Sequence, residues 1–300
     1  MKVGIHLPQW GSLATRAAVL EVACAAEEAD LDSVWVADHI AYPIESRTAY
    51  PYRSKGPPFS STDGFLEAIT QLAVVAGATS RVRLGTSVLV LPMREPLLAT
   101  TMLATLDVLS DGRCSFAVGA GWWREEFDVV AAPFDGRGRR MDEQIAILKT
   151  AWQHGIFAHH GSSYDFETVA SLPLPVQPGG PPLLIGGNGS LSWRRAAAVG
   201  DGWHAVGLTV AALRDGRDRI AAIAQTLGRD PDRLMYSTSS GMARSPDETV
   251  TRLGEFLDAG IDQVVLNIGT VGADLRAYRQ AIDELGESVL PQLAGRLCRK

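Results

Sequence analysis

The chain has 300 residues and a formal net charge of −6 at pH 7. Hydrophobic residues make up 46% of it and charged residues 21%, which is typical of a globular protein and excludes a disordered or fibrous chain. Binding along a phosphate backbone requires a basic face, so this acidic balance argues against a nucleic-acid partner. No apolar stretch approaches the ~20 residues of a membrane helix, which argues against a membrane partner.

The cysteine pattern points to a reducing compartment. Cysteines at positions 24, 114 and 298 lie far apart, without His or Cys neighbours at metal-ligand spacing. A disulfide framework and a structural zinc site are therefore not expected, and a cytoplasmic location is predicted. The N-terminus has no apolar core of a signal peptide, which agrees with that location. His159 and His160 have no carboxylate cluster at ligand spacing, so no metal site is predicted.

Short apolar runs alternate with longer amphipathic stretches from end to end. The apolar runs predict strands over residues 3–7, 33–37, 82–91, 114–118, 183–185, 202–205, 234–240 and 263–268. The amphipathic stretches predict helices over residues 14–29, 65–76, 96–109, 141–154, 191–199, 210–227, 247–259 and 274–290. Residues 38–63 and 119–140 are predicted to be irregular, and 155–182 to be an insertion with a small hairpin.

Eight repeated strand–helix units predict a parallel sheet with right-handed crossovers. Their number and the chain length suit an α/β fold of the (β/α)8 TIM-barrel type, with an irregular insertion at about 155–182 in a single domain spanning 1–300. A doubly wound open sheet is the alternative. The first strand–loop–helix segment, residues 4–11, lacks the dinucleotide-binding glycine fingerprint, which argues against that alternative.

In such a barrel, chemistry is carried at the carboxyl ends of the strands. Asp38 and His39 directly follow the second strand. An imidazole there can move protons near neutral pH, and a neighbouring carboxylate can orient it. The alternative is a histidine that only hydrogen-bonds the following loop. The same position rule selects His6, Ser87, Val88, Trp203 and His204.

Two glycine-rich segments follow further strands. The first, Gly186-Gly187-Asn188-Gly189, leads into a helix whose N-terminus favours an anion, so it predicts a phosphate site. The alternative is a plain turn with Ser190 as the helix N-cap. The second, Gly119-Ala120-Gly121 followed by Trp122, lets a flat ring approach the backbone beside an aromatic wall. Its alternative is a tight turn.

Two further features flank these segments. Glu125 and Glu126 fit a general acid, a ligand contact or a pair at a helix start. The loop over residues 40–63 carries several aromatic side chains and favours an apolar or aromatic substrate. Tyr42 from this loop and Trp122 are the predicted walls of the substrate pocket, with Tyr50, Tyr52 and Phe59 nearby.

Taken together, eight segments of the chain resemble the bacterial luciferase-like flavin and deazaflavin oxidoreductases, most of all the branch that uses coenzyme F420. In family order they are VGIHLPQWG, DSVWVADH, SRVRLGTSVLVLP, TLDVLSDGR, FAVGAGW with the later EEF, RGRRMDEQIAILKTAW, PPLLIGGNG and RRAAAVGDGW. They cover residue 1 to about residue 203. The last hundred residues match only as a barrel pattern.

The resemblance implies a (β/α)8 barrel, a homodimer and a ring of coenzyme F420, or alternatively FMN, over the barrel mouth. It places Asp38 and His39 beside the ring and the substrate, with His39 as the base. It implies a non-prolyl cis peptide at Ser87-Val88 that supports the ring face. The remaining cofactor contacts would come from Gly119, Ala120, Gly121, Gly186, Gly187, Asn188 and Gly189.

One position departs from the family pattern. Relatives that oxidise sugar phosphates carry a Glu directly after the Gly-x-Gly, where this chain has Trp122. Their acid–base pairing therefore does not transfer, and a sugar-phosphate substrate is not expected.

Three functional hypotheses follow. The first is an oxidoreductase that transfers a hydride between coenzyme F420 and a small organic substrate, with His39 as acid or base held by Asp38. The second is an FMN-dependent monooxygenase on the same scaffold. The third is a non-catalytic protein that binds a flavin or deazaflavin.

Overall fold

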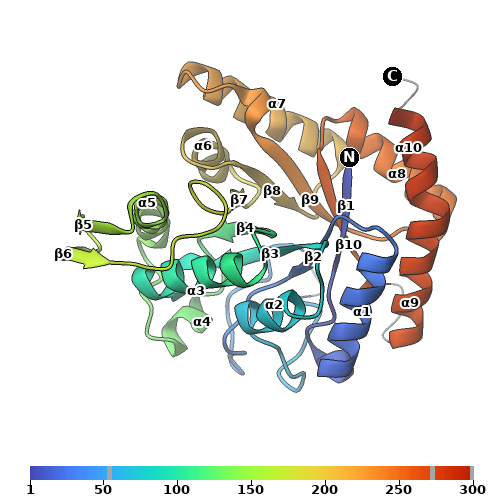
Figure 1. Ribbon diagram of the computed structural model, residues 1–300, viewed down its shortest axis with the longest axis horizontal. Coiled ribbons are helices and arrows are strands. Elements are labelled where there is room, and N and C mark those ends of the chain that lie inside the picture. The colour runs from blue at the N-terminus through green and yellow to red at the C-terminus, as the bar shows by residue number, and fades with distance from the viewer. Residues whose placement is uncertain (53–55, 271–273, 298–300) are drawn as a thin grey trace.

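Eight parallel strands close into a barrel in the order β1-β10-β9-β8-β7-β4-β3-β2 (Figure 1). The computed structural model describes residues 1–52, 56–270 and 274–297. The barrel confirms the predicted (β/α)8 architecture. Its strands are β1 (Lys2–His6), β2 (Ser33–Val36), β3 (Arg83–Val90), β4 (Cys114–Gly119), β7 (Leu183–Gly186), β8 (Gly202–Val206), β9 (Met235–Gly241) and β10 (Gln263–Asn267).

Helices surround the barrel close to the predicted positions. They are α1 (Arg16–Glu28), α2 (Ala68–Ala76), α3 (Pro96–Leu109), α5 (Arg137–His154), α6 (Ser190–Ala198), α7 (Val210–Thr226), α8 (Pro246–Asp258) and α9 (Leu275–Glu284). Caps set their starts: the Thr15 hydroxyl accepts from Ala18 N–H, so α1 begins at Arg16 rather than at Ala14. The last helix also extends beyond its predicted end, because α9 continues through a π-helical segment, Leu285–Val289, into α10 (Leu290–Leu297).

The segment 119–140, predicted to be irregular, contains a helix. The short α4 spans Arg124–Val129, and α5 begins at Arg137, four residues before the predicted start. Six residues are too few for an apolar period to be recognised. The signal present in the sequence is the acidic pair Glu125 and Glu126 in the first turn of α4, where negative charge is favourable.

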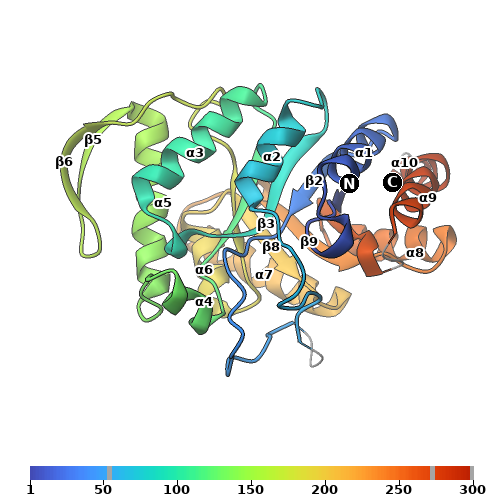
Figure 2. The same ribbon diagram turned by 90° about the horizontal axis from the view of Figure 1, so that it is seen from below.

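The insertion carries the expected small hairpin. Strands β5 (Ile156–His160) and β6 (Asp165–Ala170) pair antiparallel, and Figure 2 shows them projecting beyond α5, away from the barrel. In the described part of the chain, no helix is long and apolar enough to cross a membrane.

The barrel interior forms the floor beneath the candidate site. Trp35, Ala117, Leu184 and Val265 pack there as a buried cluster. The Trp35 ring stacks on the imidazole of His204 with centroids 5.3 Å apart. A Cβ on Gly85 would lie 2.5 Å from the Trp35 ring, so a side chain at that position would displace the indole.

Candidate active site

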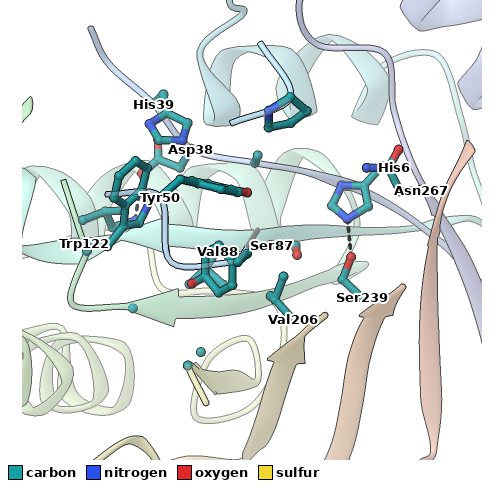
Figure 3. A pocket seen from close by; sticks show the side chains of 18 of the residues that line it. His6, Asp38, His39, Tyr50, Ser87, Val88, Trp122, Val206, Ser239 and Asn267 are labelled. Carbon is teal, nitrogen blue, oxygen red and sulfur yellow. Dashed lines mark hydrogen bonds between the residues drawn. The ribbon is translucent and has the colours of Figure 1, made fainter. Parts of the chain in front are cut away.

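A cavity of about 270 Å³ opens at the carboxyl ends of the strands. All eight barrel strands, or the residues directly after them, contribute to its lining. Figure 3 shows His39, Tyr50 and Trp122 on one side of Val88, and His6, Ser239 and Asn267 on the other. The predicted residues that line the cavity are Asp38, His39, Ser87, Val88, Gly119, Ala120, Gly121, Trp122, Gly186 and Gly187.

The expected non-prolyl cis peptide is present between Ser87 and Val88. It coincides with a register shift between β3 and β4, so Val88 projects into the barrel mouth. A Cβ built on Gly119 would lie 2.9 Å from Val88 Cγ1, and one on Gly186 would lie 2.7 Å from it. Both glycines are therefore needed to accommodate the Val88 side chain, whatever else approaches them.

Neutral imidazoles lie beneath this peptide. His204 Nε2 is 2.8 Å from Ser87 Oγ, and its Nδ1 is 3.0 Å from Ser237 Oγ. Burial, and next the neighbouring His6, lower the pKa of His204 to about 3. Burial likewise lowers the pKa of His6 to about 4, and His6 Nε2 lies 2.9 Å from Ser239 Oγ. Both rings are uncharged at pH 7, so the floor is polar but carries no positive charge.

Asp38 does not orient His39, contrary to the prediction. Its buried carboxylate forms two hydrogen bonds with Arg94, at 2.6 and 2.8 Å, and accepts a third from Val90 N–H at 2.8 Å. Burial alone would lower the pKa of Arg94, but Asp38 and then Glu67 outweigh it and raise that pKa. This ion pair ties the end of β2 to the end of β3, and it occupies both oxygens of Asp38.

Glu126 is the carboxylate that contacts His39. Its Oε2 lies 2.9 Å from His39 Nδ1, and its Oε1 accepts from the backbone N–H groups of Ile40 at 2.7 Å and Ala41 at 3.3 Å. The Glu126 side chain is 2% exposed and that of His39 is 14% exposed. The sequence alone is compatible with three roles for Glu126: a general acid, a ligand contact or one member of an acidic pair at a helix start. Glu126 directly precedes the buried Phe127 within α4, but nothing in this short helix singles out His39 as its partner.

The neighbouring carboxylate, that of Glu125, binds a different part of the loop after β2. Glu125 accepts hydrogen bonds from Arg47 N–H at 2.7 Å and Thr48 N–H at 3.2 Å. Hydrogen bonding, first of all from Thr48, holds the pKa of Glu125 at about 2. The Trp123 indole donates to Ser46 Oγ at 2.8 Å. The start of α4 thus holds the loop after β2 at two places, residues 39–41 and residues 46–48.

Aromatic side chains form the outer wall of the cavity. The Trp122 ring stacks on Trp123 at 5.0 Å and meets Tyr50 edge-on at 5.2 Å. The predicted Tyr42 lies elsewhere: it packs against Trp123 and Phe59 and lines an adjacent hollow instead of the cavity. The residues that make up the aromatic wall are Trp10, Tyr50, Tyr52, Phe59 and Trp122.

The predicted phosphate loop divides into two parts. Gly186 and Gly187 line the cavity, together with Ser192, which the sequence did not single out. Asn188 instead hydrogen-bonds both backbone groups of Val206, at 2.8 and 3.2 Å, and fastens the turn to the end of β8. Asn188 and Gly189 are not part of the cavity lining. Ser190 is the first residue of α6 rather than its N-cap, which is Gly189.

Each of the adjacent histidines of the hairpin lies beside a carboxylate. His159 lies 3.7 Å from Glu143, and His160 lies 2.7 Å from Asp165. Across residues 1–52, 56–270 and 274–297, no group of three or more His, Cys, Asp and Glu side chains is placed to hold a metal ion.

With this geometry in view, sequence comparison identifies the family. A model described as luciferase-like monooxygenase matches residues 1–287. The chain belongs to this luciferase-like family. The family resemblance recognised in the sequence motifs is thereby confirmed.

Individual relatives in the family differ in cofactor. An uncharacterized protein of Mycobacterium tuberculosis is 36% identical over 61% of this chain, a match that spans 63% of the relative's own length. An FMNH(2)-dependent dimethylsulfone monooxygenase of Pseudomonas putida is 29% identical over 62% of this chain and 57% of its own. An F420-dependent glucose-6-phosphate dehydrogenase of Amycolatopsis mediterranei is 26% identical over 92% of this chain and 94% of its own.

Solved structures agree on the fold. Monooxygenase RslO1 from Streptomyces bottropensis superposes with a TM-score of 0.79 at 20% identity, covering 97% of this chain and 99% of its own. The coenzyme F420 dependent tetrahydromethanopterin reductase from Methanopyrus kandleri gives a TM-score of 0.76 at 18% identity, covering 97% and 99%. The family therefore includes F420-dependent and FMN-dependent enzymes on one barrel.

Proposed function

We propose that this enzyme transfers a hydride between coenzyme F420 and a small organic substrate. The observation that carries the proposal is that His39 lines the same cavity as Val88 and the glycine segments around it. A proton-transfer group and a surface suited to a flat ring thus share one site. The proposal extends to a cytoplasmic homodimer, which rests on the family resemblance and on cysteine usage.

The residues present fit a flat, three-ring cofactor. Gly119, Gly121, Gly186 and Gly187 present backbone instead of side chains to the cavity, and Val88 provides an apolar surface between them. Gly187 and Ser192, beside the start of α6, would hold an anionic part of the cofactor. When bound, a deazaflavin supplies hydride transfer at its central ring carbon.

His39 would move the proton that accompanies the hydride. As an alcohol is oxidised, its hydroxyl proton would pass to the His39 imidazole, and in ketone reduction the proton would return. The two buried imidazoles, His6 and His204, do not compete for this proton at pH 7, because burial keeps both uncharged.

An FMN-dependent monooxygenase is the second candidate. The FMNH(2)-dependent relative, 29% identical over 62% of this chain, favours it. The same glycine segments accept either ring, because the two rings have similar shapes. Oxygen consumption by the FMN-loaded protein in the presence of a reductant would support this candidate over the first.

Replacement of His39 tests the leading proposal. We expect His39→Ala to lower F420-dependent turnover by about 10²–10⁴-fold, the usual contribution of a general acid or base. The Kd for F420 should change less than about threefold, because Val88 and the glycines that line the cavity remain. The probes are a panel of secondary alcohols with F420 and of ketones with reduced F420, and His160→Ala in the hairpin is the matched control. Equal turnover by His39→Ala would remove this residue from the mechanism, and tight F420 binding without turnover of any probe would favour a non-catalytic binding protein.

A further inference from the structure

We infer that Glu126 is the positioning residue that fixes the tautomer of His39 and leaves its Nε2 as the basic atom. The structural part of this inference stands on contacts alone. Its catalytic consequence rests on the proposed function.

The hydrogen-bond pattern around the Glu126 carboxylate is asymmetric. Oε1 accepts from the backbone N–H groups of Ile40 and Ala41, at 2.7 and 3.3 Å. Oε2 is left to face His39 Nδ1 at 2.9 Å. An ionised carboxylate only accepts hydrogen bonds, so a neutral imidazole in this position must donate Nδ1–H. Its lone pair then lies on Nε2.

Other groups near His39 are engaged elsewhere. Asp38 is held by Arg94 and Val90 N–H, Glu125 by residues 46–48, and Asp63 accepts from the backbone and hydroxyl of Ser60. The remaining neighbours are aromatic rings: Phe59, Phe65, Trp122 and Trp123. Within the described ranges, Glu126 is the one hydrogen-bond partner of the His39 ring. The tautomer is therefore set by a single contact.

The backbone donors also determine what an amide at position 126 would do. In Glu126→Gln, the amide oxygen is the only atom able to accept from Ile40 and Ala41 N–H. The amide nitrogen must then occupy the place of Oε2 and point its hydrogen at His39 Nδ1. This forces the opposite tautomer, with hydrogen on Nε2 and no lone pair there. A nearly isosteric change thus converts the basic atom into a donor.

Nitrogen-15 NMR of the histidine rings tests the inference without any cofactor. At a pH where His39 is neutral, long-range proton–nitrogen correlations distinguish the two tautomers, and His39→Asn assigns the signal. We expect Nδ1–H in the wild-type protein and Nε2–H in Glu126→Gln. Glu125→Gln is the matched control, one residue away on the same helix, and should keep the wild-type tautomer.

Turnover provides the second measurement. In F420-loaded enzyme, Glu126→Gln should lower kcat by about 10²–10⁴-fold, as a wrong tautomer does in a serine protease, with KM changed much less. Glu126→Asp retains a carboxylate and should recover part of this loss. Glu125→Gln should lose at most about tenfold.

Three results would overturn the inference. They are Nε2–H in the wild-type protein, an unchanged tautomer in a folded Glu126→Gln, or the same tautomer change in Glu125→Gln. The wild-type spectrum decides the first even if the variant does not fold. If the wild-type protein turns over no probe with F420 or FMN, the proposed function fails while the tautomer assignment is still tested.

Discussion

His39 Nδ1 and Glu126 Oε2 lie 2.9 Å apart although 87 residues separate them in the chain. His39 follows β2 and Glu126 belongs to α4, after β4, while β3 lies between these strands in the barrel. The contact therefore joins the segments that follow β2 and β4, on either side of β3. It joins His39, in the loop after β2, to the short helix α4. The same helix also holds residues 46–48 of that loop through Glu125.

Asp38 is predicted to act through stability rather than through the proton transfer. Asp38→Asn leaves the guanidinium of Arg94, whose side chain is 9% exposed, without its main partner. Breaking a buried ion pair from one side costs roughly 3–5 kcal/mol, and we expect a loss of that size in the free energy of unfolding. Urea unfolding measures it, and the His39 tautomer should stay unchanged.

Glu67→Gln is the control for that experiment. Glu67 contacts the same Arg94 at 3.3 Å, but its side chain is 37% exposed. Pairs of this kind contribute about 1 kcal/mol or less, and the amide oxygen of the Gln variant can still accept from the N–H groups of Ile69 and Thr70 that Glu67 caps. If the two variants lost equal stability, the ion pair with Asp38 would not be the main restraint on Arg94.

Val88 and its two glycines are predicted to be coupled. Gly119→Ala places a methyl group 2.9 Å from Val88 Cγ1, and overpacking of this kind costs about 1–3 kcal/mol. Adding Val88→Ala should recover part of the loss, which a double-mutant cycle in urea measures. Gly64→Ala is the control, since nothing lies within 4 Å of its Cβ position, and it should change stability by less than about 0.5 kcal/mol. Additive effects of Gly119→Ala and Val88→Ala would contradict this coupling.

The sequence was sufficient for the barrel because eight apolar runs alternate with eight amphipathic stretches. The cis peptide was implied by the family resemblance alone, whereas glycine content at the strand ends was enough to select the two glycine segments. Adjacency in the chain predicts Asp38 as the partner of His39, and this prediction is wrong. The side chains of neighbouring residues at a strand end point to different sides, so Asp38 faces Arg94 whereas His39 faces Glu126.

The position of Tyr42 could not be predicted from the sequence either. Its aromatic character and place in a long loop were visible in the sequence, but the anchoring contacts of α4 with residues 39–41 and 46–48 were not. Those contacts decide which rings face the cavity. Trp10, which lies before α1, belongs to the wall without any local signal for it.

Stability should fall between pH 6.5 and pH 4 because of the buried imidazoles. In this window the unfolded chain binds a proton at His6, whose folded pKa is about 4, so lowering the pH favours the unfolded state. The loss from His6 alone reaches roughly 3 kcal/mol by pH 4, at about 1.4 kcal/mol per pKa unit. In His6→Gln, the urea midpoint of unfolding should fall less steeply between pH 7 and pH 4.5 than it does in the wild-type protein.

A carboxylate variant separates this effect from ordinary acid denaturation. Hydrogen bonds from Ser162, Ser163 and Tyr164 outweigh desolvation and lower the pKa of Glu143 to about 2. The stability that it contributes is present above pH 4.5 and is lost as the pH falls toward 2. Glu143→Gln should therefore leave the pH dependence of the urea midpoint above pH 4.5 unchanged. If the pH dependence of the urea midpoint were the same in His6→Gln as in the wild-type protein, the His6 imidazole would not be the source of the stability loss.

Trp122 is predicted to form part of the substrate surface. Trp122→Ala removes the stacked pair with Trp123 and the edge contact with Tyr50. Because Trp122 also lines the cavity, the variant loses an aromatic contact with the substrate worth about 0.5–1.5 kcal/mol, so KM for a ketone probe should rise up to about tenfold. Tyr42→Ala, in the adjacent hollow, should change KM less, and an equal rise in both variants would place the substrate outside the cavity.

Parallel titration of the purified protein with coenzyme F420 and with FMN, followed by fluorescence quenching, tests the central claim most directly. We expect F420 to bind with a micromolar or tighter Kd and FMN to bind more weakly. Preferential binding of FMN would contradict hydride transfer with F420 and move the assignment to oxygen chemistry. Binding of neither would contradict the cofactor cradle formed by Val88 and the glycine segments.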